Sequence, residues 1–345
     1  MTIHVLDGAA SIAIGVGALR VVAYGRPATL AMRLEAVDSH GHALEGLVRA
    51  GPSVVVIPSL PGPVRLRVAP EGGGAFAAGA AVGLTLVALR GGADDEIRQP
   101  EVDVAGLTQR DLVVLEPAAR GIAVAAIAGE VALEELAGRA RAAAREILGV
   151  ERVPAEHSLD VTIAIDGSAS MGTEQAAAAR GAVLDVLDGL ATTIGRPNRP
   201  VRVVVAAEGL HWIDGASAGG IAAAVEARIA TLPPVLGAAL GSPDLRTRFP
   251  EENSMTYVVT DGMPGDIARV AEDNEVEGEA RHLVLLAAPP STSQGAIDVP
   301  VTWVGTGTAL RDRLLVDGEA LRHLVRALLD GCFVPGTPLA ERVRR

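Results

Sequence analysis

Hydrophobic and polar positions follow different patterns in the two halves of the chain. Up to about residue 128, short apolar runs are separated by turn-forming segments such as Gly25-Arg26-Pro27 and Pro61-Gly62-Pro63. Several short strands spaced by such turns are typical of an antiparallel sandwich or barrel. The runs cover residues 11–16, 19–24, 29–37, 53–57, 64–68, 82–89, 112–115 and 122–127. We therefore expect residues 1–130 to form a β-rich, sandwich-like domain, whose residues point to no particular role.

The pattern changes to a helical period after residue 130. Residues 131–148 contain no Pro and place Leu136, Ala140, Ala144 and Ile147 on one stripe. Gly149 ends this predicted helix, because glycine readily adopts the left-handed conformation that closes a helix. We expect residues 131–153 to form a linker helix between the two halves, with its apolar stripe against the flank of the second domain.

From residue 154 onward, apolar runs of strand length alternate with longer helical patterns. The runs predict strands at 159–165, 201–206, 254–260, 282–287 and 300–304, a short edge strand at 210–213, and helices at 173–194, 221–229, 235–245, 264–273 and 310–329. Such alternation implies parallel pairing with right-handed crossovers. The expected fold of residues 154–332 is α/β, a doubly wound, mostly parallel sheet with helices on both faces. Residues 333–345 are expected to form a C-terminal tail.

A polar loop follows the first of these strands. It reads Asp166-Gly167-Ser168-Ala169-Ser170-Met171-Gly172 and precedes the first helix. In an extended loop alternate side chains point the same way, so Asp166, Ser168 and Ser170 are expected to face one point. One carboxylate and two hydroxyls suit a hard cation such as Mg²⁺, which prefers oxygen ligands and keeps several waters. The loop therefore predicts a metal site.

A second acidic residue follows another predicted strand. Asp261 comes directly after the apolar run 254–260 and precedes the turn residues Gly262 and Pro264. In open α/β sheets, ligands bind in the crevice beyond the carboxyl ends of the strands. We therefore expect Asp166 and Asp261 to contribute to the same site.

These two segments resemble the von Willebrand factor A family with its metal-ion-dependent adhesion site. The family pattern is Asp-x-Ser-x-Ser, then a Thr in a later loop, then an Asp after a further strand. The first and last parts match here at Asp166, Ser168, Ser170 and Asp261. The resemblance covers roughly the second half of the chain, and it implies a doubly wound fold and a bound Mg²⁺ or Mn²⁺.

The middle part of the family pattern does not match. Where the family commonly has Gly-Gly-Thr before a helix, this chain has Pro234 at the Thr position. Proline has no side-chain oxygen. Either Thr231 reaches in from a shifted loop, or the site has only four protein ligands. We therefore expect low affinity for Mg²⁺ or Mn²⁺.

Charge and composition exclude several classes of function. The net charge is -12 over 345 residues and basic residues do not cluster, which argues against nucleic-acid binding. Residues 72–89 are uncharged, but their Gly and Ala content favours a buried β-hairpin over a membrane span. Cys332 is the single cysteine and the N-terminus lacks the basic region of a signal peptide, so we expect a reducing, cytoplasmic location. Positive side chains are all Arg, which is typical of high-GC bacterial genomes.

Two catalytic interpretations of the polar loop fail on spacing. A nucleophile elbow needs Gly-x-Ser-x-Gly, and neither Ser168 nor Ser170 has it. Haloacid-dehalogenase-like phosphatases also carry an Asp after the first strand, but that family places a second Asp two residues later, where Ser168 stands. The chain also has no Lys to serve as that family's phosphate anchor. A phosphohydrolase-like enzyme is therefore the least favoured alternative.

The favoured hypothesis is a non-catalytic protein-interaction module. In it, an acidic group of a partner protein completes the coordination of a bound Mg²⁺. The family resemblance implies a partner such as an AAA ATPase of the MoxR type or a stress-response component. The alternative is a scaffold with a degenerate metal site, which Pro234 favours.

Overall fold

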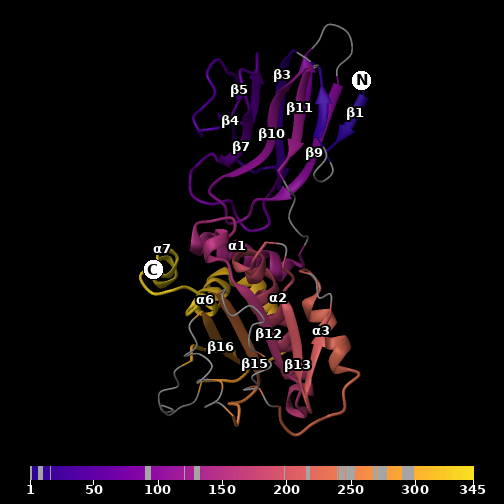
Figure 1. Cartoon of the computed structure of the whole chain (residues 1–345), viewed down its shortest axis with the longest axis vertical. Helices are drawn as coiled ribbons and strands as arrows, with labels where there is room; N and C mark the ends of the chain where they lie inside the picture. Colours follow the sequence, from indigo (N-terminus) through magenta and orange to yellow (C-terminus); the bar gives the residue numbers. More distant parts are fainter. Residues whose placement is uncertain are drawn as a thin grey trace. The chain divides into compact units, whose positions relative to one another are not determined.

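In the computed structural model, the chain forms two compact units, Met1–Val131 and Ala132–Arg345 (Figure 1). The structure describes residues 2–6, 11–15, 17–89, 95–119, 121–127, 133–197, 199–214, 218–238, 240, 245, 253–266, 270, 278–289 and 299–345. Among these residues, no helix has the length and hydrophobicity needed to cross a membrane. The protein has a mixed α/β structure.

The first unit consists of two mostly antiparallel sheets, which confirms the prediction of a β-rich N-terminal half. One six-stranded sheet has the order β1-β9-β8-β3-β6-β5, and a five-stranded sheet has the order β2-β11-β10-β7-β4. Among the described strands of this unit, only β1 and β9 pair in parallel. The bounds are β1 Thr2–Val5, β2 Ser11–Ile14, β3 Ala18–Arg26, β4 Met32–Asp38, β5 Val48–Gly51, β6 Val54–Ile57, β7 Val64–Pro70, β8 Ala81–Leu89, β9 Asp95–Asp103, β10 Arg110–Ala118 and β11 Gly121–Ala126.

Alternation of side chains along these strands builds one shared core. In β3, Leu19, Val21 and Ala23 are buried, and in β7 Leu66 and Val68 are buried. Successive side chains of a strand point to opposite faces, so every second residue of each sheet enters the core. Strand β9 lay outside the predicted runs, because its sequence Asp-Glu-Ile-Arg-Gln-Pro-Glu-Val-Asp is mostly polar.

The second unit contains a six-stranded, mostly parallel sheet in the order β14-β13-β12-β15-β16-β17. The bounds are β12 Asp160–Asp166, β13 Arg202–Ala206, β14 Leu210–Ile213, β15 Ser254–Thr260, β16 Glu279–Leu285 and β17 Val301–Trp303. The edge strand β14 is antiparallel to β13, as expected for the short edge strand. Every residue of β12 and of β15 is buried, which is typical of central parallel strands covered on both faces.

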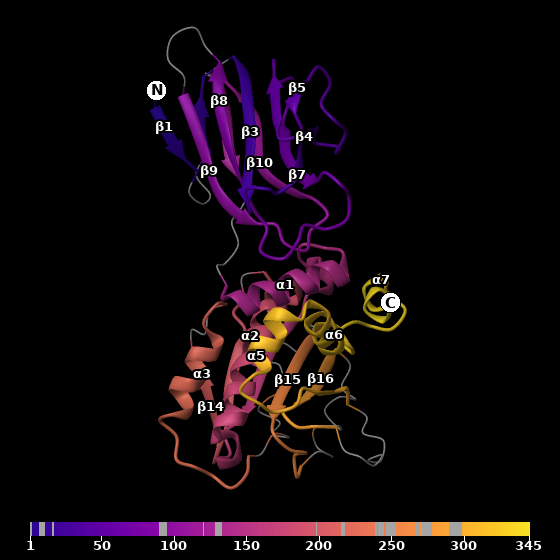
Figure 2. The same ribbon diagram turned by 180° about the vertical axis from the view of Figure 1, so that it is seen from behind.

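The described helices and one face of this sheet form one hydrophobic core. The helices are α1 Glu135–Leu148, α2 Glu174–Ile194, α3 Ile221–Ile229, α5 Leu310–Val316, α6 Gly318–Leu329 and α7 Pro338–Arg344. Figures 1 and 2 show the sheet from its two sides, with α2, α5 and α6 behind the strands in one view and in front of them in the other. The other face of the sheet packs against Leu240, Leu245, Val270 and Val299.

The helix predictions have mixed outcomes. The described residues 235–238 are not helical, and Val235 forms an isolated β-bridge instead, so the prediction of a helix starting at residue 235 was wrong. Most of the helix predicted at 264–273 lies outside the described residues. The helix predicted at 310–329 is two helices, because the Asp317 side chain accepts hydrogen bonds from the N–H groups of Glu319 (3.1 Å) and Ala320 (3.0 Å) and so caps α6.

Helix α1 is built into the core of the second unit. Its stripe of Leu136, Ala140, Ala144 and Leu148 is buried, and α1 packs along α2. The two helices approach so closely that a Cβ atom on Gly189 of α2 would lie 2.0 Å from the Ala137 carbonyl oxygen. The predicted linker helix therefore packs against the second domain, as expected. It also forms part of the hydrophobic core of the second unit.

The C-terminal segment also docks onto α1. Helix α7 buries Leu339 and Val343 in the same core, and the Arg342 guanidinium donates to the Leu148 carbonyl at the end of α1. Thr337 caps α7 by accepting a hydrogen bond from Ala340 N–H (3.3 Å).

The first prediction compares two fragments of the chain. A fragment covering 132–345 is expected to unfold cooperatively, whereas a fragment covering 154–345 is expected to lose cooperative thermal unfolding, because removing α1 exposes the apolar surface of α2. Circular dichroism during heating measures both. Equal melting temperatures for the two fragments would mean that α1 is a dispensable linker.

The second prediction concerns a buried carboxylate between α2 and α3. Asp188 is 3% exposed and accepts a hydrogen bond from Gly219 N–H (2.8 Å) just before α3. Burial raises the pKa of Asp188 to about 6, although hydrogen bonds from Gly219 and Ile221 oppose the rise. The folded state therefore binds a proton more tightly than the unfolded state, so this group adds stability as the pH falls from 7 toward 5.

Asp188→Asn keeps an acceptor oxygen and removes the buried charge. The variant is expected to melt higher than the wild type at pH 7, and the difference should shrink as the pH falls to 5. Melting temperatures of the two proteins in matched buffers measure this. A constant difference across this range would contradict the assignment of a raised pKa to Asp188.

Candidate functional site

The two predicted acids lie at adjacent strand ends. Strands β12 and β15 pair in parallel with Ile165 opposite Val259, so Asp166 at the end of β12 lies beside Thr260, and Asp261 follows directly. The chain leaves β12 toward β13 on one side, while β15 lies on the other side. Such a reversal of strand order opens a crevice at the carboxyl ends of the two strands, where open α/β sheets bind ligands.

A tight loop carries the chain away from Asp166. Gly167 donates a hydrogen bond to the Ala206 carbonyl of β13 (2.7 Å), and a Cβ atom on Gly167 would lie 2.8 Å from Val205 Cγ1. Only glycine allows the loop to pass this close to β13. The Asp166 carboxylate then accepts a hydrogen bond from Ser168 N–H (2.8 Å), which folds the loop back over the strand end.

A buried arginine supports the far side of this loop. Arg180 of α2 is 1% exposed, donates to the Met171 carbonyl (2.7 Å), and pairs with both carboxylate oxygens of Glu226 on α3. Thr173 begins α2 by accepting a hydrogen bond from Ala176 N–H (3.3 Å). The loop is therefore held between β13, α2 and α3, which positions its side chains.

Hydrogen bonds connect the polar side chains into one set. Ser168 Oγ and Ser170 Oγ are 3.0 Å apart, and Ser170 Oγ donates to Asp261 Oδ1 (3.1 Å). Thr260 Oγ1 donates to Asp166 Oδ2 (2.7 Å). The structure thus brings together the predicted residues Asp166, Ser168, Ser170 and Asp261.

The set is buried at one end and open at the other. Asp166 and Ser168 are each 7% exposed, whereas Ser170 lies at the surface and Asp261 is half-buried. Within the described part of the chain, neither carboxylate forms an ion pair, and no cluster of three or more His, Cys, Asp or Glu residues forms a metal site. Two carboxylates next to three hydroxyls, with no described Arg paired to either carboxylate, form an oxygen-rich set that suits a hard cation.

Thr231 is not joined to these four residues. It lies exposed after α3, and its hydroxyl donates to the Arg228 carbonyl (2.7 Å). The following segment runs beside the loop, because Ala169 N–H donates to the Val235 carbonyl (2.8 Å) and Ser168 forms a parallel β-bridge with Val235. Pro234 comes directly before Val235 in this segment. The segment therefore passes the site where a Thr ligand was expected, but Pro234 has no hydroxyl.

Sequence reasoning missed Thr260, whose hydroxyl binds Asp166. Because Thr260 is the last residue of an apolar run, it resembles an ordinary β-branched strand residue. The signal that identifies it is its place directly before Asp261 at a strand end, beside the end of β12. Thr260 is only 2% exposed, so its hydroxyl needs a hydrogen-bond partner, and Asp166 supplies it.

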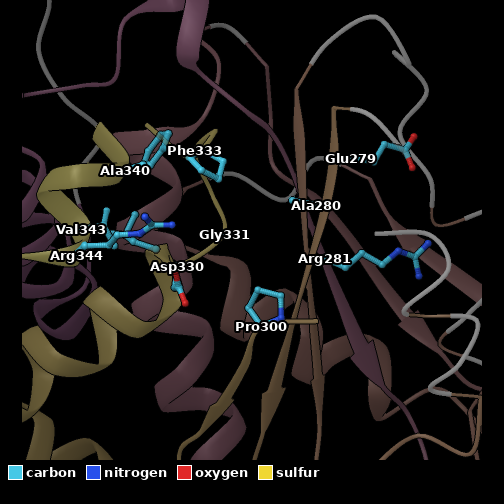
Figure 3. Close-up of a pocket in the computed structure, with 12 residues that line it drawn as sticks. Glu279, Ala280, Arg281, Pro300, Asp330, Gly331, Phe333, Ala340, Val343 and Arg344 are labelled. Atoms are coloured by element: carbon cyan, nitrogen blue, oxygen red, sulfur yellow. The ribbon is translucent and has the colours of Figure 1, made fainter. Parts of the chain in front are cut away.

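A cavity at the other end of the sheet has different chemistry. Its volume is about 410 Å³, and it lies between the start of β16 and the C-terminal segment (Figure 3). The close-up shows the side chains of Glu279 and Arg281 extending away from Asp330 and Arg344. Charged groups therefore do not converge on one point in this cavity, in contrast to the strand-end set.

Comparisons with known proteins add no assignment. No protein-family model matches the chain, and no curated protein matches it in sequence.

The third prediction tests the contact between Thr260 and Asp166. Thr260→Val preserves the shape but leaves Asp166 Oδ2 without its donor, which is expected to lower the free energy of unfolding by about 1–3 kcal/mol. Thr260→Ser keeps the hydroxyl and is expected to lose less. Urea unfolding of the three proteins measures the difference. Wild-type stability in the Val variant would mean that this hydrogen bond does not hold the site.

Proposed function

We propose that the second unit is a non-catalytic protein-interaction domain that binds an acidic group of a partner protein through a divalent metal. The observation that carries this proposal is the joining of Asp166, Ser168, Ser170 and Asp261 at the ends of two adjacent parallel strands. Each of these residues comes from a segment that resembles the metal-ion-dependent adhesion site of the von Willebrand factor A family.

The topology of the sheet supports a domain of this type. With β12 counted first, the order is 3-2-1-4-5-6, which is the order of a doubly wound sheet. The antiparallel edge strand β14 and the polar loop after the central strand β12 fit the same architecture. In the first unit, two mostly antiparallel sheets around one core support a sandwich-like arrangement.

The oxygen chemistry of the site favours Mg²⁺ or Mn²⁺. Asp166 and Asp261 would hold the ion by their charge, and Ser168 and Ser170 would hold it by their hydroxyls. Since Thr231 is bonded to the Arg228 carbonyl, water would fill the remaining positions and the affinity would be low. When bound, the ion would supply positive charge that attracts a carboxylate of the partner.

The serines lack the partners that a hydrolase requires. Ser168 and Ser170 contact each other, Asp261 and backbone groups, and no His side chain is among their described hydrogen bonds. A serine nucleophile needs an adjacent general base. This supports recognition over turnover, with an AAA ATPase or a stress-response component as the partner class that the family resemblance implies. The single cysteine, Cys332, cannot form a disulfide within the chain, which supports a reducing, cytoplasmic location.

One observation favours a second candidate function, a scaffold without metal. The hydroxyls of Thr260 and Ser170 already donate one hydrogen bond to each carboxylate, so the side chains form a hydrogen-bond network without any ion. A network of this kind would hold the strand ends together and bind nothing.

The fourth prediction separates the two candidates. In the wild type, Mg²⁺ and Mn²⁺ are expected to raise the melting temperature, with about 1.4 kcal/mol of added stability when the ion is at ten times its dissociation constant. Asp166→Asn keeps an acceptor for Ser168 N–H but removes charge, so it is expected to abolish the rise. Ser168→Ala removes a neutral ligand and is expected only to weaken it.

The matched control is Asp312→Asn, which removes one carboxylate from the exposed face of α5. It is expected to respond to metal as the wild type does. Isothermal titration with Mg²⁺ and Mn²⁺ measures the binding directly. If millimolar Mg²⁺ and Mn²⁺ leave the melting temperatures of the wild type, Asp166→Asn and Asp312→Asn unchanged, the metal-dependent proposal is wrong. The scaffold without metal is then the remaining candidate.

A further inference from the structure

One face of the first unit is unusually apolar. It is the outer face of the six-stranded sheet, defined as the side turned away from the core shared with the five-stranded sheet. The pairing registers place its side chains in two cross-strand rows. The first row consists of Ile3, Glu96, Val87, Arg20, Val56 and Val48, and the second row consists of Val5, Arg98, Thr85, Val22 and Val54.

Exposed apolar side chains gather on this outer face. Among the described residues, eight large apolar side chains are exposed, and five of them belong to strands of this sheet. They are Ile3, Val5, Tyr24, Val48 and Leu89, and Val5 and Val48 are 55% and 56% exposed. Between them lie the half-buried side chains of Val22, Val54, Val56 and Val87. A contiguous apolar patch of this kind on a folded domain marks an interaction surface.

The five-stranded sheet provides an internal comparison. Its outer face carries Arg33, Glu35, Arg65, Arg67 and Asp111, which form ion pairs with one another. An antiparallel sheet with one face in water normally alternates in this way, apolar inward and polar outward. The apolar outer face of the six-stranded sheet is therefore a departure from the pattern that the same unit follows elsewhere.

We propose that this outer face binds the same face of a second copy of the chain, as a two-fold symmetric dimer. Such an interface brings identical surfaces together, so the surface must be complementary to itself. Sheets pack face to face at about 10 Å when apolar side chains interdigitate. The valines in the two rows supply such side chains on both copies.

The charges on the outer face support a second copy as the occupant. Glu96 and Arg98 are neighbours on β9, one in each row, and they form an ion pair within the chain. Consider a two-fold axis that lies in the interface, perpendicular to the strands and midway between the two rows. It places Glu96 of one copy opposite Arg98 of the other, and Arg98 of the first copy opposite Glu96 of the second. The Arg98 side chain is 52% exposed and can pair across the interface. In this arrangement Glu96 is not buried without a partner.

The area of the face is sufficient for a dimer of moderate affinity. With strands about 4.8 Å apart, six strands span roughly 29 Å, and the outward side chains between Leu89 and Tyr24 extend roughly 20 Å along the strands. The face therefore offers on the order of 600 Å² per copy, or about 1,200 Å² in total, which is the lower end of the range of stable interfaces. A dimer that dissociates on dilution is the expected result.

Sedimentation of the full-length protein from micromolar to high micromolar concentration tests the proposal. We expect a concentration-dependent monomer–dimer equilibrium. Val22→Glu, at the centre of the second row, buries a carboxylate in the interface and is expected to raise the dissociation constant at least about tenfold. Val5→Glu, at the exposed edge of the same row, is expected to weaken the dimer without affecting the fold, and it serves as the second variant if Val22→Glu melts early.

The matched control is Val114→Glu, because Val114 is a half-buried valine on the outer face of the five-stranded sheet, beside Arg65. It is expected to leave the equilibrium unchanged. A wild type that stays monomeric at every concentration would overturn the proposal and leave a different protein as the occupant of the face. A dimer that Val22→Glu and Val5→Glu do not weaken would also overturn it, because another surface would then carry the contact.

Discussion

The parallel pairing of β12 with β15 is the contact on which the candidate site depends. Both strands are buried along their whole length, so their register is fixed by packing on two faces, and it places Asp166 beside Thr260 and Asp261. Two carboxylates at adjacent strand ends repel each other unless their charge is offset. Hydroxyls of Thr260 and Ser170 reduce the repulsion by hydrogen bonding, but they bring no positive charge. A divalent cation would supply it, which is the physical basis of the proposed function.

The helical layer keeps this strand end in place. Arg180 links the polar loop to α2 and α3 through the Met171 carbonyl and Glu226, and α2 in turn packs against α1 at Gly189. A buried arginine with a fixed carboxylate partner is costly to disturb, since breaking the pair leaves an uncompensated charge in the core. The loop therefore rests on a rigid support, as a preorganised binding site requires.

Sequence reasoning located the strands of the second unit and the four clustered residues, because buried parallel strands read as continuous apolar runs and an Asp after such a run marks a strand end. It failed where the local signal was absent. The polar strand β9 has no apolar run, and the break between α5 and α6 depends on one cap, Asp317, inside a continuous helical pattern. Thr260 could not be assigned to the site, because its partner Asp166 is distant in sequence and only the strand register brings them together.

The central claim is that the four oxygen-bearing side chains at the strand ends hold a divalent metal. The most direct measurement is the anomalous X-ray difference map of a crystal soaked in Mn²⁺, whose scattering locates the ion without reference to any activity. The account predicts one strong peak between Asp166, Ser168, Ser170 and Asp261, and no such peak in Asp166→Asn crystals soaked in the same way. Wild-type crystals with no peak there, or with Mn²⁺ bound only elsewhere, would contradict it.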